Sequence, residues 1–163
     1  MLLIFYLKQN SLPFPHFHTY SCQNILIEPI IMTNNLQRFV VAHEGGSRWS
    51  DASYEDALEE VRNGRKVSHW IWYIFPQMKG QGYSAASEYY GIANREEAKA
   101  YIEHSVLGPH LVEISQAYLA TGKEAYRVFG DDAIKVRSCM LLFASVSDNP
   151  VFKEVCKRNS WLI

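Results

Sequence analysis

The chain has 163 residues, of which 48% are hydrophobic and 20% charged, and its formal net charge is -1 at pH 7. This length and composition predict one globular domain with one core, and they exclude a disordered chain. The near-neutral charge argues against a general nucleic-acid or membrane-surface binder.

The first 31 residues differ from the rest of the chain. They contain three prolines and aromatic residues without helical period, and their only charged residues are Lys8 and Glu28. We therefore predict that residues 1–31 are a disordered extension outside the core, and that residues 32–163 form the domain. The apolar run at the start is short and lacks a preceding basic residue, so it makes a poor signal peptide.

From Met32 onward, apolar residues recur with helical spacing between capping residues and glycines. The predicted helices lie before Gly45, between the cap Ser53 and Gly64, from Ser84 or Ser87 toward Tyr90, from Asn94 to about His104, from Gly108-Pro109 to Gly122, from Asp131 or Asp132 to about Ser145, and from Asn149-Pro150 onward. The expected fold class is all-α, a compact single domain of about six to seven helices.

The aromatic segment Val67–Gln77 is ambiguous. Its β-branched and aromatic residues favour a strand that is buried on both faces. A single strand among helices would leave its backbone donors and acceptors unpaired in the interior. We therefore predict a buried aromatic helix that ends near Pro76, with the other helices packed around it.

The three cysteines, Cys22, Cys139 and Cys156, are widely spaced and form no C-x-x-C pair. This pattern favours a reducing, cytoplasmic location over a disulfide framework or a thiolate zinc site. His104 and His110 are badly spaced for two ligands of one metal on a helix. We therefore predict no metal and no cofactor.

A glycine turn follows the aromatic segment. Gly80 and Gly82 would let the backbone approach a ligand closely, and free amides at a helix start attract anions. Lys79 adds a positive charge, and Trp70 and Trp72 offer flat surfaces for stacking. The alternative is that the turn only connects two helices and that the aromatic residues are core.

His69 is the candidate catalytic residue, because histidine titrates near neutral pH and can act as acid or base. The alternative is a buried histidine with a structural hydrogen bond. Asp132 and Lys135 lie one helical turn apart, so they form either a surface ion pair or a charge pair at the pocket.

The run SHWIWYIFPQ at residues 68–77, with the following G-x-G-x-S, resembles the signature of the domain-of-unknown-function family eighteen-ten. Further matches to the family occur at Ser87, Tyr90, Val106-Leu107-Gly108, Phe129-Gly130, Asp132, Lys135, Ser138, Met140 and Phe143. The resemblance spans about residues 36–152 and implies an all-α fold, but no established activity. Family members tend to continue past the last helix, so we expect a truncated C-terminus here.

The sequence departs from the family at two places. The usual Ser-Ser-Met-Thr pattern is Ser138-Cys139-Met140-Leu141 here, and the proline that follows the histidine is replaced by Ser105. Any role of the second serine hydroxyl or of the threonine in the Ser-Ser-Met-Thr pattern therefore does not carry over to this chain.

Over the aromatic run alone, the chain is also similar to the NAD and ADP-ribose associated (NADAR) glycosidase-type families.

These observations predict a domain that binds an anionic or nucleotide-like small molecule at the aromatic helix and the glycine turn. The alternatives are a protein-interaction module and, least favoured, a single-stranded RNA binder. Besides His69, the predicted ligand-binding residues are Ser68, Trp70, Trp72, Gln77, Lys79, Gly80, Gly82, Ser84, Ser87, Tyr90, Asp132 and Lys135.

Overall fold

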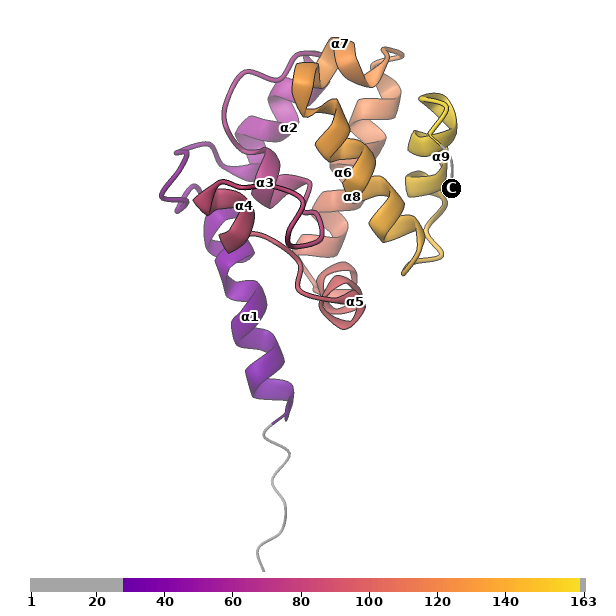
Figure 1. The fold of residues 1–163 in the computed structure, drawn as a ribbon. Coiled ribbons are helices and arrows are strands. Elements are labelled where there is room, and N and C mark those ends of the chain that lie inside the picture. The colour runs from indigo at the N-terminus through magenta and orange to yellow at the C-terminus, as the bar shows by residue number, and fades with distance from the viewer. Residues whose placement is uncertain (1–27, 162–163) are drawn as a thin grey trace, which may run out of the picture.

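A computed structural model describes residues 28–161 of the chain (Figure 1). Over this range the chain forms helices connected by short loops, and the all-α fold class is confirmed. The elements are α1 (Glu28–His43), α2 (Tyr54–Arg62), α3 (Ile71–Ile74), α4 (Ala85–Tyr89), α5 (Arg95–Glu103), α6 (Leu107–Ala120), α7 (Ala125–Phe129), the 3-10 turn η1 (Gly130–Asp132), α8 (Ala133–Ala144) and α9 (Pro150–Arg158). Within residues 28–161, no helix combines the length and apolar character that crossing a membrane requires.

Capping residues set the helix ends as the sequence predicts. The side chains of Ser53, Asn94 and Asn149 each accept a hydrogen bond from a backbone amide in the first turn of α2, α5 and α9. After α2 and α6, Gly64 and Gly122 adopt φ values of 72° and 70°. Glycine takes this left-handed conformation with little strain, so both helices end at these positions.

The predicted boundary between the extension and the domain falls inside α1. This helix begins at Glu28, before Met32. Pro29 is compatible with the first turn, because the amides there have no partner within the helix. Residues 1–27 of the predicted extension lie outside the described residues, so the structure leaves that prediction as it stands.

The aromatic segment is less helical than predicted, because only Ile71–Ile74 form a helix. The amides of Val67 and Ser68 donate to the side chain of Glu60 instead of entering a helix. Beyond Pro76 the chain is extended and pairs with the segment at Ile92, whose amide donates to the carbonyl of Gln77. Hydrogen bonds to distant parts of the chain therefore replace the helical ones that we expected.

The segment does lie at the centre of the core. The side chains of Trp70, Tyr73 and Phe75 are at most 1% exposed. The Phe75 ring lies 5.5 Å from the ring of Phe129 at the end of α7, and α3 packs against α1. In Figure 1, α3 lies between α1 and the helices α6 and α8. The core thus surrounds the aromatic segment, as predicted.

Helices α8 and α9 pack against each other at the C-terminal side of the domain. Each contributes a cysteine, Cys139 from α8 and Cys156 from α9, and neither side chain has exposed surface. Burial raises the pKa of both thiols.

Candidate functional site

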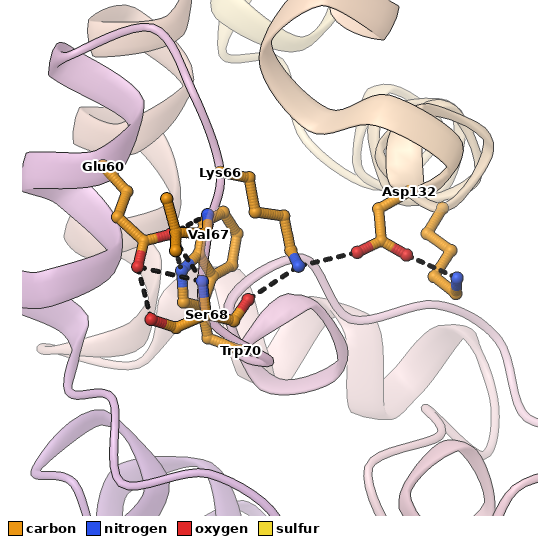
Figure 2. Close-up of polar contacts among 7 residues, drawn as sticks. Glu60, Lys66, Val67, Ser68, Trp70 and Asp132 are labelled. Carbon is orange, nitrogen blue, oxygen red and sulfur yellow. Dashed lines mark hydrogen bonds and ion pairs between the residues drawn. The ribbon is translucent and has the colours of Figure 1, made fainter.

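The carboxylate of Glu60 on α2 fixes the loop that leads into α3 (Figure 2). It accepts hydrogen bonds from the amides of Val67 and Ser68 at 2.6 and 3.0 Å, and also from the Ser68 hydroxyl. The indole N–H of Trp70 donates to the same carboxylate at 2.8 Å. The polar atoms of Ser68 and Trp70 are therefore already engaged within the protein.

Glu60 stays ionised at neutral pH. Burial raises the pKa of its carboxyl, but the hydrogen bonds from Ser68, Val67 and Trp70 outweigh burial and lower the pKa. Donors that are satisfied only by the charged form favour that form. The loop thus depends on a negative charge at its base.

A chain of alternating charges continues from this loop to α8. The Lys66 ammonium donates to the carbonyl of Ser68 at 2.7 Å and lies 2.8 Å from the Asp132 carboxylate. The Lys135 ammonium approaches the other oxygen of Asp132 at 2.6 Å. Burial raises the pKa of Asp132, but hydrogen bonds from Lys135 and Lys66 outweigh it and lower the pKa. Two ammonium groups share the carboxylate of Asp132, and with Glu60 the charges of this chain balance, so that Lys135 is its positive end.

Trp72 lies where the charged group meets the glycine turn. The Lys135 ammonium lies 5.1 Å from the centre of the Trp72 ring, within the range of a cation–π contact. At the edge of the ring, a Cβ atom at Gly82 would lie 2.8 Å from Cη2 of Trp72 and from Ser87. Only glycine allows the turn to approach this ring so closely. Four predicted site residues, Trp72, Gly82, Lys135 and Asp132, are thus brought together.

The start of α4 satisfies its own polar groups. The Ser84 hydroxyl accepts from the Ser87 amide at 3.1 Å, and the Ser87 hydroxyl donates to the Ser84 carbonyl at 2.7 Å. Gly80 has a φ of 86°, and a Cβ atom there would meet no other atom. Gly80 therefore has the left-handed conformation expected of a glycine in a turn. The hydroxyls of Ser84 and Ser87, in contrast, are engaged in hydrogen bonds between these two residues.

The remaining predicted residues are dispersed. His69 is exposed on the loop before α3, and Gln77 is buried, with its amide nitrogen unpaired among the described atoms. Lys79 lies 3.6 Å from Glu88, toward the α1 side of the molecule. Tyr90 is buried, and its ring centre lies 5.8 Å from that of Phe39.

Sequence reasoning missed the role of Glu60 and gave Lys66 no structural role. Both residues lie at ordinary solvent-facing positions in the local pattern, so no helical period marks them. The partner of Glu60, Trp70, lies ten residues further on, directly before α3, and the partner of Lys66, Asp132, lies far away in the sequence. Only the three-dimensional packing brings these charges together.

The sequence also gave no function to His43, which is buried at the end of α1. Its Nε2 lies 3.0 Å from the carbonyl oxygen of Tyr73, and its Nδ1 lies 2.9 Å from Nδ1 of His110 on α6. A carbonyl only accepts, so we assign the proton of neutral His43 to Nε2, and the His110 Nδ1–H then donates to His43. Tyr54 stacks on His110 with ring centres 3.7 Å apart.

This pairing has a clear electrostatic consequence. Burial is the main cause that lowers the pKa of His43 to about 4. Burial also lowers the pKa of His110. A proton on Nδ1 of His43 would require His110 to switch its tautomer and accept at Nδ1, and burial of His43 already disfavours its charged form.

Fold and site together define a compact all-α domain whose central aromatic segment is fixed by the half-buried carboxylate of Glu60 and a shared lysine–aspartate group. The chain belongs to the family described as Protein of unknown function (DUF1810), whose sequence profile matches residues 33–160. This result confirms the resemblance that rests on the aromatic motif.

Among solved structures, the chain is similar to the conserved hypothetical protein Rv1873 from Mycobacterium tuberculosis. The two are 37% identical, with a TM-score of 0.70, and the match covers 77% of this chain and 87% of that one. None of the curated proteins compared matches the chain. Neither description names an activity, so the function has to be argued from the residues.

Proposed function

We propose that the domain binds an anionic or nucleotide-like small molecule at the surface where Trp72, Lys135 and the Gly80–Ser84 turn meet. The observation that carries the proposal is the Lys135 ammonium beside Trp72, at the positive end of the chain of charges. Lys66 and Lys135 share the single carboxylate of Asp132, and the Lys135 ammonium lies over the Trp72 ring. A phosphate is the natural third partner for such a group.

Each predicted residue then has a proposed role. Lys135 pairs with the anionic group, and the half-buried Trp72 ring stacks with a flat base or sugar. Gly82 gives backbone access beside that ring. His69 lies exposed at the start of the same segment, where it would exchange a proton with the ligand. The engaged residues, Ser68, Trp70, Ser84, Ser87 and Asp132, position the others, and Gln77, Lys79, Gly80 and Tyr90 border the turn.

A thermal-shift experiment with pyrophosphate, NAD and ADP-ribose tests the proposal. A ligand that binds only the folded chain stabilises it by about 2.7 kcal/mol at a hundred times its Kd. We expect at least one probe to raise the Tm of the wild type and to lose this effect in Lys135→Met. The control is Lys153→Met, an exposed lysine on α9, which removes the same charge elsewhere.

Two outcomes of the thermal-shift experiment would contradict the proposal. If none of the probes stabilises the wild type, or if both lysine variants lose the effect equally, the proposed site is wrong. His69→Gln adds a second test, because it should change turnover or its pH dependence more than binding.

A protein-interaction module is the second candidate, and one observation favours it. The side chains of Val67 and Ile134 are 71% and 65% exposed, and they flank the Lys66–Asp132 ion pair. Exposed apolar side chains around a charged pair suit a protein contact. In either case, the unpaired cysteine pattern of the sequence favours the cytoplasm as the compartment.

A further inference from the structure

A hollow lies on another part of the molecule, between α1, the loop that follows it and the end of α4. In Figure 1, α4 lies beside the C-terminal half of α1. The hollow has a volume of about 390 Å³, within the range of small-molecule sites. Its walls are the backbone at Gly46 and the side chains of Gln37, Arg38, Val41, Arg48, Tyr89 and Tyr90. Two walls are arginines, and none of these seven residues is acidic.

Arg48 is held by aromatic rings and by no carboxylate. Its guanidinium carbon lies 5.0 Å from the centre of the Trp49 ring and 5.2 Å from that of Tyr89. These contacts orient the group without neutralising its charge. Among the side chains that the structure describes, residues 36–161, no Asp or Glu lies within ion-pair distance of it. An oriented and uncompensated guanidinium therefore faces the hollow.

Arg38 supplies a second guanidinium whose position is fixed. It donates to the Gly91 carbonyl at 3.0 Å and to the Glu97 carboxylate at 2.8 Å, and its side chain is only 12% exposed. Glu97 balances the charge of Arg38, so the excess charge at the hollow is that of Arg48. Arg38 is thus held on the α1 side of the hollow, whereas Arg48 lies on the loop that follows α1.

The charges of both arginines affect the pKa of Tyr90. Burial raises the pKa of its hydroxyl, whereas a hydrogen bond with Ser47 and the positive charges of Arg48 and Arg38 act in the opposite direction. Tyr90 and the two arginines line the same hollow. The loop is also pressed onto α1, because a Cβ atom at Gly46 would lie 2.6 Å from the Val41 side chain.

We propose that this hollow binds a small oxyanion, a phosphate or carboxylate, that is carried on a flat ring. Arg48 binds the oxyanion through its planar fork of N–H groups, which matches two oxygens at once. Tyr89, whose side chain is 42% exposed, stacks on the ring of the ligand. This inference does not rest on the Trp72 surface, since the two sites share no residue that binds the anion.

Calorimetric titration of the full chain with adenosine 5′-monophosphate tests the inference. We expect the wild type to bind this ligand. In Arg48→Gln the affinity should fall by about tenfold or more, because a charge-assisted hydrogen bond is lost. Arg48 is exposed, so the variant should fold normally. The matched control is Arg127→Gln, an exposed arginine on α7, which changes the net charge equally and should bind normally.

Two further comparisons separate the parts of the ligand. Ribose 5-phosphate carries the anion without the ring, and adenosine carries the ring without the anion. We expect Tyr89→Ala to weaken adenosine 5′-monophosphate but not ribose 5-phosphate, and adenosine to bind more weakly than its phosphate.

Three outcomes would overturn the inference. The wild type does not bind adenosine 5′-monophosphate at millimolar concentration, or Arg48→Gln and Arg127→Gln weaken it equally. In the third, Lys135→Met abolishes binding while Arg48→Gln leaves it intact, so that the ligand belongs to the Trp72 surface. This last result would support the proposed function and remove the second site.

Discussion

Replacing Glu60 with alanine should destabilise the domain far more than an ordinary helix-surface change. The substitution removes the acceptor of the Trp70 indole N–H and of the amides of Val67 and Ser68. A buried donor without a partner costs about 1–3 kcal/mol. The Trp70 side chain has no exposed surface, so its N–H should bear the full cost, whereas water can reach the two amides. We expect a total loss of about 3 kcal/mol.

Urea unfolding at pH 7 measures this loss through the midpoint at constant m value. The control is Glu59→Ala, one position earlier on α2, where the carboxylate is exposed. This variant changes the same charge and should lose no more than about 0.5 kcal/mol. Equal losses in the two variants would refute the assignment of Glu60 as the anchor of the loop.

The pH dependence gives the same argument a second test. The pKa of Glu60 is lower in the folded chain than its ordinary value, because the donors outweigh burial. Its contribution to stability is therefore present above the ordinary carboxyl range and is lost as the pH falls through the lowered pKa. The difference between wild type and Glu60→Ala should shrink under acid conditions, and a constant difference would contradict this account.

Three further predictions concern the stability of the domain. Burial lowers the pKa of His43 from 6.5 to about 4, so the unfolded chain binds a proton more readily than the folded chain. As the pH falls from 6.5 to 4, the free energy of unfolding should therefore decrease by about 3 kcal/mol. The urea midpoint of His43→Phe should change less over this pH range than that of the wild type. Trp70→Ala should cost about 3–5 kcal/mol, and Trp72→Ala clearly less because its ring is partly exposed, as urea unfolding would show. A chain that begins at Met32 should melt within a few degrees of the full chain by calorimetry, and loss of cooperative unfolding would contradict the predicted boundary.

The sequence predicts those parts of the fold that local chemistry decides. Ser53, Asn94 and Asn149 act as helix caps because a short polar side chain and a nearby amide suffice. Gly64 and Gly122 end helices because their conformation is local as well. The all-α class follows from the helical spacing of the apolar residues, and the central position of the aromatic segment follows from its apolar composition.

Long-range hydrogen bonds decide the features that the sequence did not predict. The aromatic segment is helical over only four residues, because Glu60 and the backbone at Ile92 bind the amides and carbonyls on either side. The pairing of His43 with His110 is of the same kind. Of the predicted site, Trp72, Gly82, Asp132 and Lys135 come together, whereas Lys79 pairs with Glu88 and His69 is exposed on the loop before α3.

The two buried cysteines at the contact of α8 and α9 allow the opening of this part of the domain to be measured chemically. A thiol reacts as its thiolate, and burial both hides Cys139 and Cys156 and raises the pKa of each. Modification therefore has to wait until the two helices part. The rate at which a disulfide reagent labels these two residues thus reports how often this side of the domain opens, without any denaturant.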